Sequence, residues 1–197
     1  STWARSFSNV QQRAIPAIFM RGGTSKGLFF RADQLPAEST ARDRIFLAAL
    51  GSPDPYGRQL DGMGGGISSL SKVMVVERSQ RPGVVLDYTF GQVAVDRPLV
   101  DYAGNCGNLT AAVGPFAIAC GLLRPGGTTA RLALFNTNTG KRVIASFALD
   151  EAGQAAVLGD YRLPGVAGRG APIRLDFEDP GGAVTGRLLP SGQARET

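Results

Sequence analysis

The sequence of 197 residues contains no histidine. This absence excludes Ser-His-Asp and Cys-His nucleophilic systems built from the chain alone. It also excludes zinc sites with a histidine ligand, and the two cysteines are too few for a four-cysteine zinc site. Any proton transfer carried out by this chain must therefore rely on cysteine, lysine, aspartate, glutamate or tyrosine.

Lysine is nearly as scarce as histidine. Only Lys26, Lys72 and Lys141 occur, and arginine supplies the remaining cations. The net charge is +5 at pH 7, but the arginines are scattered and no basic run is interleaved with aromatic residues. The charge therefore predicts an ordinary solvated surface and no nucleic-acid partner, and attraction of a small acidic substrate is the minor alternative.

The number of cysteines bears on the expected compartment, and the length of the apolar runs bears on whether the chain enters a membrane. Cys106 and Cys120 fall in one apparently helical stretch, where a rise of about 1.5 Å per residue separates them by roughly 21 Å, too far for a disulfide. No apolar run approaches the roughly 20 residues of a membrane span. The polar opening STWARSFSNVQQR lacks the apolar core of a signal peptide. We therefore expect a cytoplasmic protein with reduced cysteines that does not enter a membrane.

The composition is that of a folded domain with many turns. Hydrophobic residues make up 43% of the chain, which is enough to bury a core. Glycine occurs 27 times, about twice its average share of roughly 7%. The length fits one domain or two small ones.

Hydrophobic patterning predicts about eight short strands and two helices after a flexible lead-in at 1–13. Residues 39–50 form an amphipathic helix that Gly51 ends, whereas 108–120 is apolar on every side and predicts a buried helix with an irregularity at Pro115. The predicted fold class is α+β, with a curved, mostly antiparallel sheet wrapped around the buried central helix. The predicted strands are 14–20, 27–31, 73–76, 84–88, 92–95, 130–135, 142–148 and 173–177.

The segment GNCGN places Cys106 at the start of the predicted buried helix. Free N–H groups and a partial positive charge at a helix N-terminus stabilise a thiolate, which makes a cysteine there a usable base or nucleophile. The same N–H groups, with glycines that let a ligand approach, form a carboxylate site. The alternative is a buried, inert thiol, which is what we expect of Cys120.

Lys72 ends a glycine-rich stretch, GMGGGISSLSK, that runs directly into a predicted strand. The stretch lacks the Gly-Lys pair of a phosphate-binding Walker loop and the third glycine of a dinucleotide-binding motif. It offers N–H and hydroxyl donors beside a lysine, which suits a carboxylate ligand, but a plain glycine linker has the same composition. A second donor-rich loop, RGGTSKG, carries Lys26.

Four segments together resemble one known family: IPAIFMRGGTSKGLFFR, GSPDPYGRQLDGMGGGISSLSKV, DYTFGQVAVD and GNCGNLTAAVGPFAI. They are similar to the PrpF-type proteins, the 2-methylaconitate cis-trans isomerases, whose relatives include 4-oxalomesaconate tautomerase and methylitaconate isomerase. The similarity extends over residues 14–192. The wider superfamily is that of diaminopimelate epimerase, in which two similar domains each wrap strands around a central helix.

The resemblance implies that Lys72 and Cys106 transfer protons, with no metal and no other cofactor. It also implies a carboxylate-binding cleft shaped by Ser25, Ser68, Ser69, Asn105, Gly107 and Asn108. Because members of the family are longer and have two domains, 14–192 is expected to be the N-terminal epimerase-like domain. Residues 193–197 are then the start of a linker to a second domain that completes the cleft.

The activity that the resemblance implies is cofactor-independent isomerisation of an unsaturated tricarboxylic acid. Removal of an allylic proton gives a delocalised carbanion, and reprotonation fixes a new double-bond position or geometry. This chemistry requires an acid/base pair and donors to the carboxylate oxygens. Two alternatives stay open: a keto-enol tautomerase of the 4-oxalomesaconate type, and a carboxylate-binding half-domain that is inactive without its second domain.

Overall fold

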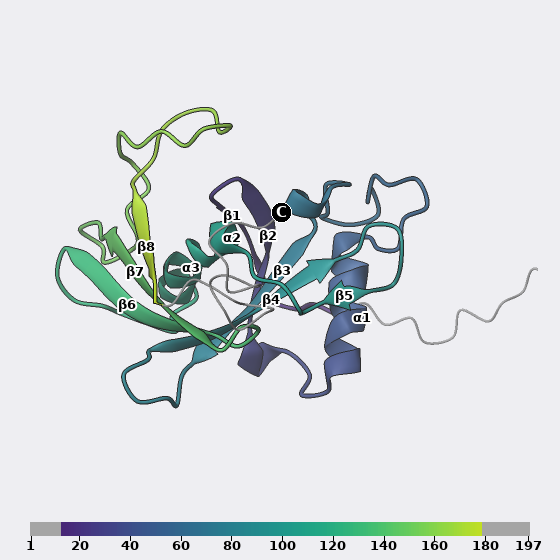
Figure 1. Cartoon of the computed structure of the whole chain (residues 1–197), viewed down its shortest axis with the longest axis horizontal. Coiled ribbons are helices and arrows are strands. Elements are labelled where there is room, and N and C mark those ends of the chain that lie inside the picture. Colours follow the sequence, from purple (N-terminus) through teal and green to yellow (C-terminus); the bar gives the residue numbers. More distant parts are fainter. Residues whose placement is uncertain (1–12, 179–197) are drawn as a thin grey trace, which may run out of the picture.

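The computed structural model describes residues 13–178, which form one curled sheet with short helices on both of its faces (Figure 1). The predicted domain 14–192 is therefore described as far as residue 178. Apart from residue 13, the predicted lead-in 1–13 lies outside the described residues, and so does the predicted linker 193–197. Within 13–178, no helix has both the length and the apolar character needed to cross a membrane.

Eight strands form the sheet in the order β1-β2-β3-β4-β6-β7-β8, with β5 paired to β4 beside this path. The pairs β2–β3 and β4–β6 are parallel, and all other pairs are antiparallel. The prediction of a mostly antiparallel sheet is confirmed. The strands are β1 Ile18–Gly22, β2 Ser25–Arg31, β3 Lys72–Arg78, β4 Leu86–Val93, β5 Val100–Asp101, β6 Thr129–Asn136, β7 Lys141–Ala148 and β8 Ile173–Phe177.

The predicted helix 39–50 is confirmed as α1 (Ser39–Leu50), which ends where Gly51 adopts φ 74°. The predicted helix 108–120 with an irregularity at Pro115 is confirmed in part: the segment is helical, but it forms two helices, α2 (Gly107–Thr110) and α3 (Val113–Ala119), and the break comes before Val113. Pro115 has no N–H to donate, so it is best tolerated in the first turn of a helix. The break before Val113 puts Pro115 there. The remaining helices are the 3-10 turns η1 (Ala32–Gln34) and η2 (Ser68–Leu70).

A second correction concerns the predicted strands 84–88 and 92–95, which are one continuous strand, β4. Gly91 lies within β4 and pairs with Val73 on β3. A Cβ on Gly91 would lie 2.8 Å from a methyl group of Val73 and 3.0 Å from one of Val100. This glycine marks a close packing contact in the sheet rather than a turn between two strands.

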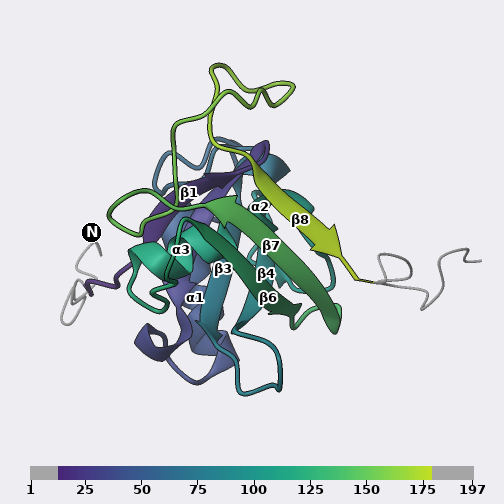
Figure 2. The same cartoon turned by 90° about the vertical axis from the view of Figure 1, so that its left-hand side faces the viewer.

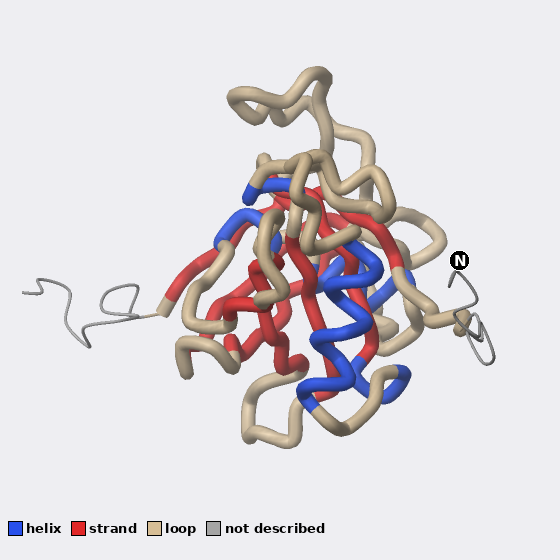
Figure 3. The backbone as a smooth tube through the Cα atoms, turned by 90° about the vertical axis from the view of Figure 1, so that its right-hand side faces the viewer, coloured by secondary structure: helices blue, strands red, loops and turns tan. Residues whose placement is uncertain are grey.

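The sheet buries apolar side chains on both faces, as neighbouring residues of β2 show. Phe29 points to the inner face, where its ring lies 5.5 Å from that of Phe116 on α3. Phe30 points to the outer face, where its ring lies 5.3 Å from that of Phe46 on α1. Figure 2 shows α3 within the curl beside β6 and β7, and Figure 3 shows α1 along the outer side. The predicted buried central helix is thus α2 and α3, and α1 is the predicted surface helix.

The turn between β1 and β2 lies directly against the start of α2. A Cβ on Gly22 would overlap the carbonyl oxygen of Asn108 and lie 2.8 Å from the Cα of Leu109. Gly23, at φ 50°, lies against the Asn108 side chain. The Asn108 Nδ2 donates a hydrogen bond to Thr24 Oγ1 at 3.1 Å. Glycine at these positions therefore allows the hairpin and α2 to touch.

We predict that Gly22→Ala lowers the free energy of unfolding by about 1–3 kcal/mol, because the new methyl group overlaps backbone that has no room to move aside. Gly126→Ala is the matched control, since no atom lies within 4 Å of a Cβ built there. Urea unfolding of both variants measures the difference. Equal stability of the two variants would contradict the contact between the turn and α2.

Candidate active site

Cys106 lies immediately before α2, in the N-cap position, and is 6% exposed. Its Sγ lies 3.8 Å from the Oγ of Ser25, the buried first residue of β2. α2 has only four residues, so little macrodipole acts on the thiol. The structure therefore joins a predicted proton-transfer residue to a predicted carboxylate-binding residue.

Buried polar side chains support the loop that carries Cys106. Thr110 Oγ1 donates to the Cys106 carbonyl at 2.9 Å, and it forms a second hydrogen bond with the Tyr88 hydroxyl, 3.3 Å away. Asn136 Nδ2 donates to Asn105 Oδ1 at 2.8 Å. Burial raises the pKa of Tyr88, while its hydrogen bonds to Thr110 and Asn136 act in the opposite direction. Tyr88 therefore stays neutral at neutral pH and serves as a fixed hydrogen-bond partner.

Lys72 is the half-buried first residue of β3. Its Nζ lies 5.0 Å from the centre of the Phe90 ring, a cation–π contact. A Cβ on Gly104 would lie 3.8 Å from the same ring. Lys72 and the loop leading to Cys106 thus share Phe90 as a neighbour, although no hydrogen bond joins Lys72 to Cys106 in the described part of the chain.

The glycine-rich loop before Lys72 is organised by one buried amide. Gln59 is 1% exposed, and its Nε2 donates to the hydroxyls of Ser52 and Ser71, each at 2.8 Å. Its Oε1 accepts the Gly66 N–H at 2.9 Å. Ser71 in turn donates to the carbonyl of Val93 at 2.8 Å. These bonds fix both ends of the loop against the strand that Lys72 begins.

Ser68 and Ser69 lie on η2, one turn before Lys72. Ser68 is exposed and Ser69 is half-buried. The Ser68 carbonyl accepts a hydrogen bond from Gln92 Nε2 at 3.0 Å, and Gln92 pairs with Lys72 across β3 and β4. Because η2 also contacts β2, both serines lie at the end of the sheet where β2 and β3 begin.

The predicted site residues therefore fall into two adjoining groups. The first surrounds the thiol and consists of Ser25, Asn105, Cys106, Gly107 and Asn108. The second consists of Ser68, Ser69 and Lys72. Sequence reasoning missed Gln59, Tyr88 and Asn136, since a lone amide in a turn-rich segment and polar residues inside strand patterns carry no motif.

No cluster of three or more histidine, cysteine, aspartate or glutamate residues within 13–178 is arranged to hold a metal ion. Both cysteines are unpaired, which confirms that no disulfide joins Cys106 to Cys120. Burial raises the pKa of the Cys120 thiol. That thiol is therefore protonated at neutral pH, as expected of a cysteine outside the site.

Residues 12–197 match the family model described as PrpF protein. This chain belongs to the PrpF family. It is 46% identical over 185 residues to the 4-oxalomesaconate tautomerase of Pseudomonas putida, a match that covers 94% of this chain and 50% of that protein. It is 43% identical over 196 residues to the 2-methyl-aconitate isomerase of Cupriavidus necator, a match that covers 94% of this chain and 49% of that protein.

A solved structure confirms the fold of the PrpF chain. The crystal structure of methylitaconate-delta-isomerase superposes with a TM-score of 0.83 at 44% identity, covering 91% of this chain and 46% of that one. The predicted α+β fold class, a curved, mostly antiparallel sheet around a buried central helical segment, is therefore confirmed. The PrpF chain spans about half the length of the curated relatives it matches.

Gln59→Asn tests whether the buried amide holds the glycine-rich loop of the PrpF chain. Gln59 has φ 53°, which asparagine tolerates, but the shorter amide reaches fewer of the Ser52, Ser71 and Gly66 partners. We predict a loss of about 1–3 kcal/mol in unfolding free energy for the buried groups left unpaired. Faster hydrogen exchange at the Gly66 amide should accompany it.

The control is Gln80→Asn, at an exposed glutamine outside the loop. It should leave both the unfolding free energy and the Gly66 exchange rate unchanged. If Gln59→Asn behaves like Gln80→Asn, the amide does not organise the loop.

Proposed function

We propose that this chain is part of a cofactor-independent isomerase that acts on an unsaturated tricarboxylic acid, as a 2-methylaconitate cis-trans isomerase does. The observation that carries the proposal is the buried Cys106 thiol beside the Ser25 hydroxyl, with Lys72 sharing the neighbouring Phe90 ring. Relatives with 43% and 44% identity, named 2-methyl-aconitate isomerase and 3-methylitaconate isomerase, support it.

The reaction is a proton abstraction followed by a proton return. A base removes a hydrogen from the carbon next to the double bond, and the electron pair spreads over the double bond into the attached carboxylate. An acid then delivers a proton to a carbon of the same system, which fixes the new geometry or position of the double bond. The substrate and product are isomers, so the balance requires no oxidant, reductant or co-substrate.

In this proposal Cys106 and Lys72 are the acid/base pair. A thiol and an amine each exchange a proton in water. Both groups lie near the end of the sheet where β2 and β3 begin, the thiol beside Ser25 and the amine on Lys72. Donors next to them stabilise the charge that develops on the carboxylate oxygens. The proposed donors are Ser25, Ser68, Ser69, Asn105, Gly107 and Asn108.

We further propose that a second epimerase-like domain of the same protein closes over this end of the sheet. Asn105, Gly107 and Asn108 are exposed around a buried thiol, an arrangement that leaves room for a covering element. In this proposal 14–192 is the N-terminal domain, and 193–197 begins the linker. A cytoplasmic location is also proposed, and the two unpaired cysteines support it.

A keto-enol tautomerase is the second candidate, supported by the 46% identity with 4-oxalomesaconate tautomerase. It uses the same proton abstraction, but the electron pair forms an enolate and the proton moves between carbon and oxygen. A substrate panel separates the two activities. A third possibility, a half-domain that binds carboxylates without turnover, predicts binding by the 197-residue chain and activity only in the whole polypeptide that contains it.

Solvent exchange in deuterium oxide tests the role of Lys72 in that whole polypeptide. With 2-methylaconitate as substrate, deuterium should enter the allylic carbon while the isomer forms. Lys72→Arg should lower the exchange rate by about 100-fold or more, because arginine keeps the charge but does not release its proton near neutral pH. NMR follows both the exchange and the isomerisation.

Lys141→Arg is the control, because Lys141 begins β7 outside the site. It should exchange at the unmodified rate. Near-normal exchange in Lys72→Arg would show that Lys72 anchors a carboxylate and transfers no proton. Absence of both exchange and isomerisation in the unmodified protein, across the whole panel, would refute the proposed activity.

A further inference from the structure

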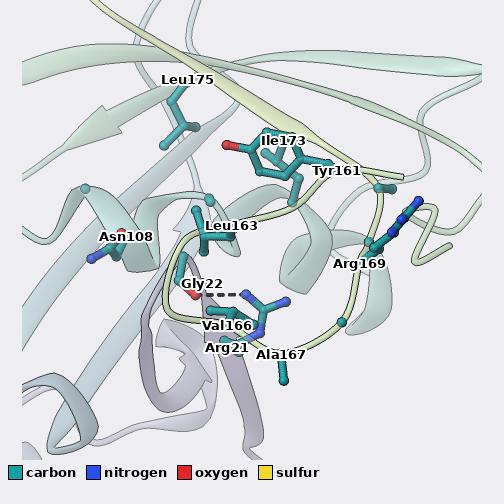
Figure 4. A pocket seen from close by; sticks show the side chains of 16 residues that line it. Arg21, Gly22, Asn108, Tyr161, Leu163, Val166, Ala167, Arg169, Ile173 and Leu175 are labelled. Carbon is teal, nitrogen blue, oxygen red and sulfur yellow. Dashed lines mark hydrogen bonds between the residues drawn. The ribbon is translucent and has the colours of Figure 1, made fainter. Parts of the chain in front are cut away.

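A pocket of about 280 Å³ lies between the start of α2 and the segment 161–171 that leads into β8. Arg21 on β1, with Gly107 and Asn108 on α2, lines one side. The segment 161–171 and Ile173 line the other side (Figure 4). Because two of the proposed carboxylate-binding residues belong to its wall, the pocket opens beside the candidate active site.

Arg21 brings a positive charge to this pocket that the described part of the chain does not neutralise with a carboxylate. It pairs directly with Lys26 across β1 and β2, and like charges in such positions disfavour the pairing. The Lys26 amine lies 5.9 Å from the ring of Phe19, and Lys26 does not line the pocket. The Arg21 Nη1 donates to the Gly23 carbonyl at 2.8 Å. The guanidinium is thereby held over the turn, with donors left for an anion.

The second arginine of the pocket is already neutralised. Arg169 Nη1 lies 3.2 Å from a carboxylate oxygen of Asp160. The pocket therefore has one uncompensated cation, Arg21, at the wall nearest the turn.

The remaining wall of the pocket is largely apolar. Leu163, Val166, Ile173 and Leu175 line it and are half-buried. In Figure 4, Val166 and Ala167 lie next to Arg21, whereas Tyr161 lies next to Ile173. A cation with an adjacent hydrocarbon wall suits a carboxylate at the end of a short carbon chain.

We propose that this pocket binds the substrate carboxylate farthest from the reacting carbon, with Arg21 as its counter-ion. The identity of the ligand rests on the proposed function, whereas the anion site itself rests on the charge and lining of the pocket. Arg21 then selects tricarboxylates over dicarboxylates that lack this terminal group. It is a specificity-determining residue and transfers no proton.

Calorimetric titration of the 197-residue chain with two unreactive ligands tests this selection. Tricarballylate is a saturated tricarboxylate, and methylsuccinate has the same three-carbon chain but lacks one terminal carboxylate. The unmodified chain should bind tricarballylate more tightly. Arg21→Gln should lower the affinity for tricarballylate about tenfold or more, because it removes a charge-assisted hydrogen bond, and should leave the affinity for methylsuccinate unchanged.

Two further variants sharpen the test. Ala167→Glu introduces a competing carboxylate at an exposed residue of the pocket wall. It should also lower the affinity for tricarballylate. Arg131→Gln removes an exposed arginine of β6 that does not line the pocket, and it should change neither affinity. Circular dichroism of each variant confirms that its fold is retained.

Failure to bind tricarballylate, or an equal effect of Arg21→Gln on both ligands, would overturn the proposed subsite. The two proposals fail separately. Binding that depends on Arg21, in a protein that exchanges no substrate proton, supports the subsite and refutes the isomerase. Exchange of a substrate proton, together with an unchanged affinity of Arg21→Gln for tricarballylate, supports the isomerase and refutes the subsite.

Discussion

The contact between the β1–β2 turn and the first turn of α2 fixes the geometry on which the candidate site depends. Gly22 and Gly23 lack the side-chain atoms that would separate the two elements. Their contact places the Ser25 hydroxyl beside the Cys106 thiol. It also sets Arg21 in the wall of the neighbouring pocket. One backbone contact thus positions the thiol, its hydroxyl neighbour and the cation that we assign to substrate selection.

Two buried hydrogen-bond networks hold this end of the sheet in place. Thr110 and Tyr88 support the Cys106 loop from inside the curl. Gln59 and Ser71 support the glycine-rich loop that ends at Lys72. Buried polar groups are costly when unpaired, so each network strongly favours a single loop conformation. Glycine-rich loops with little intrinsic order are thereby given a fixed geometry, as the proposed proton transfer requires.

Local patterns in the sequence predicted much of the fold. The 39–50 helix and the 173–177 strand have the predicted bounds because capping by Gly51 and strand alternation are local signals. An irregularity in the 108–120 helix was predicted, but its position before α3 was missed, as was the continuity of β4. Both depend on packing: Pro115 moves into a first turn, and Gly91 fits against Val73. Cys106 and Lys72 were candidates from their local sequence, and the resemblance supplied their proposed role and the remaining site residues. The supporting Gln59 and the cation Arg21 became evident only when distant segments were brought together.

The most direct test is a crystal structure of the chain with tricarballylate bound. The account predicts one terminal carboxylate at Arg21, and the carbon next to the opposite carboxylate within about 3–4 Å of the Cys106 Sγ, as a near-attack geometry requires. The Lys72 amine should face the same carbon. A ligand bound away from Cys106, with Lys72 still directed at the Phe90 ring, would contradict the assignment of these two residues to proton transfer.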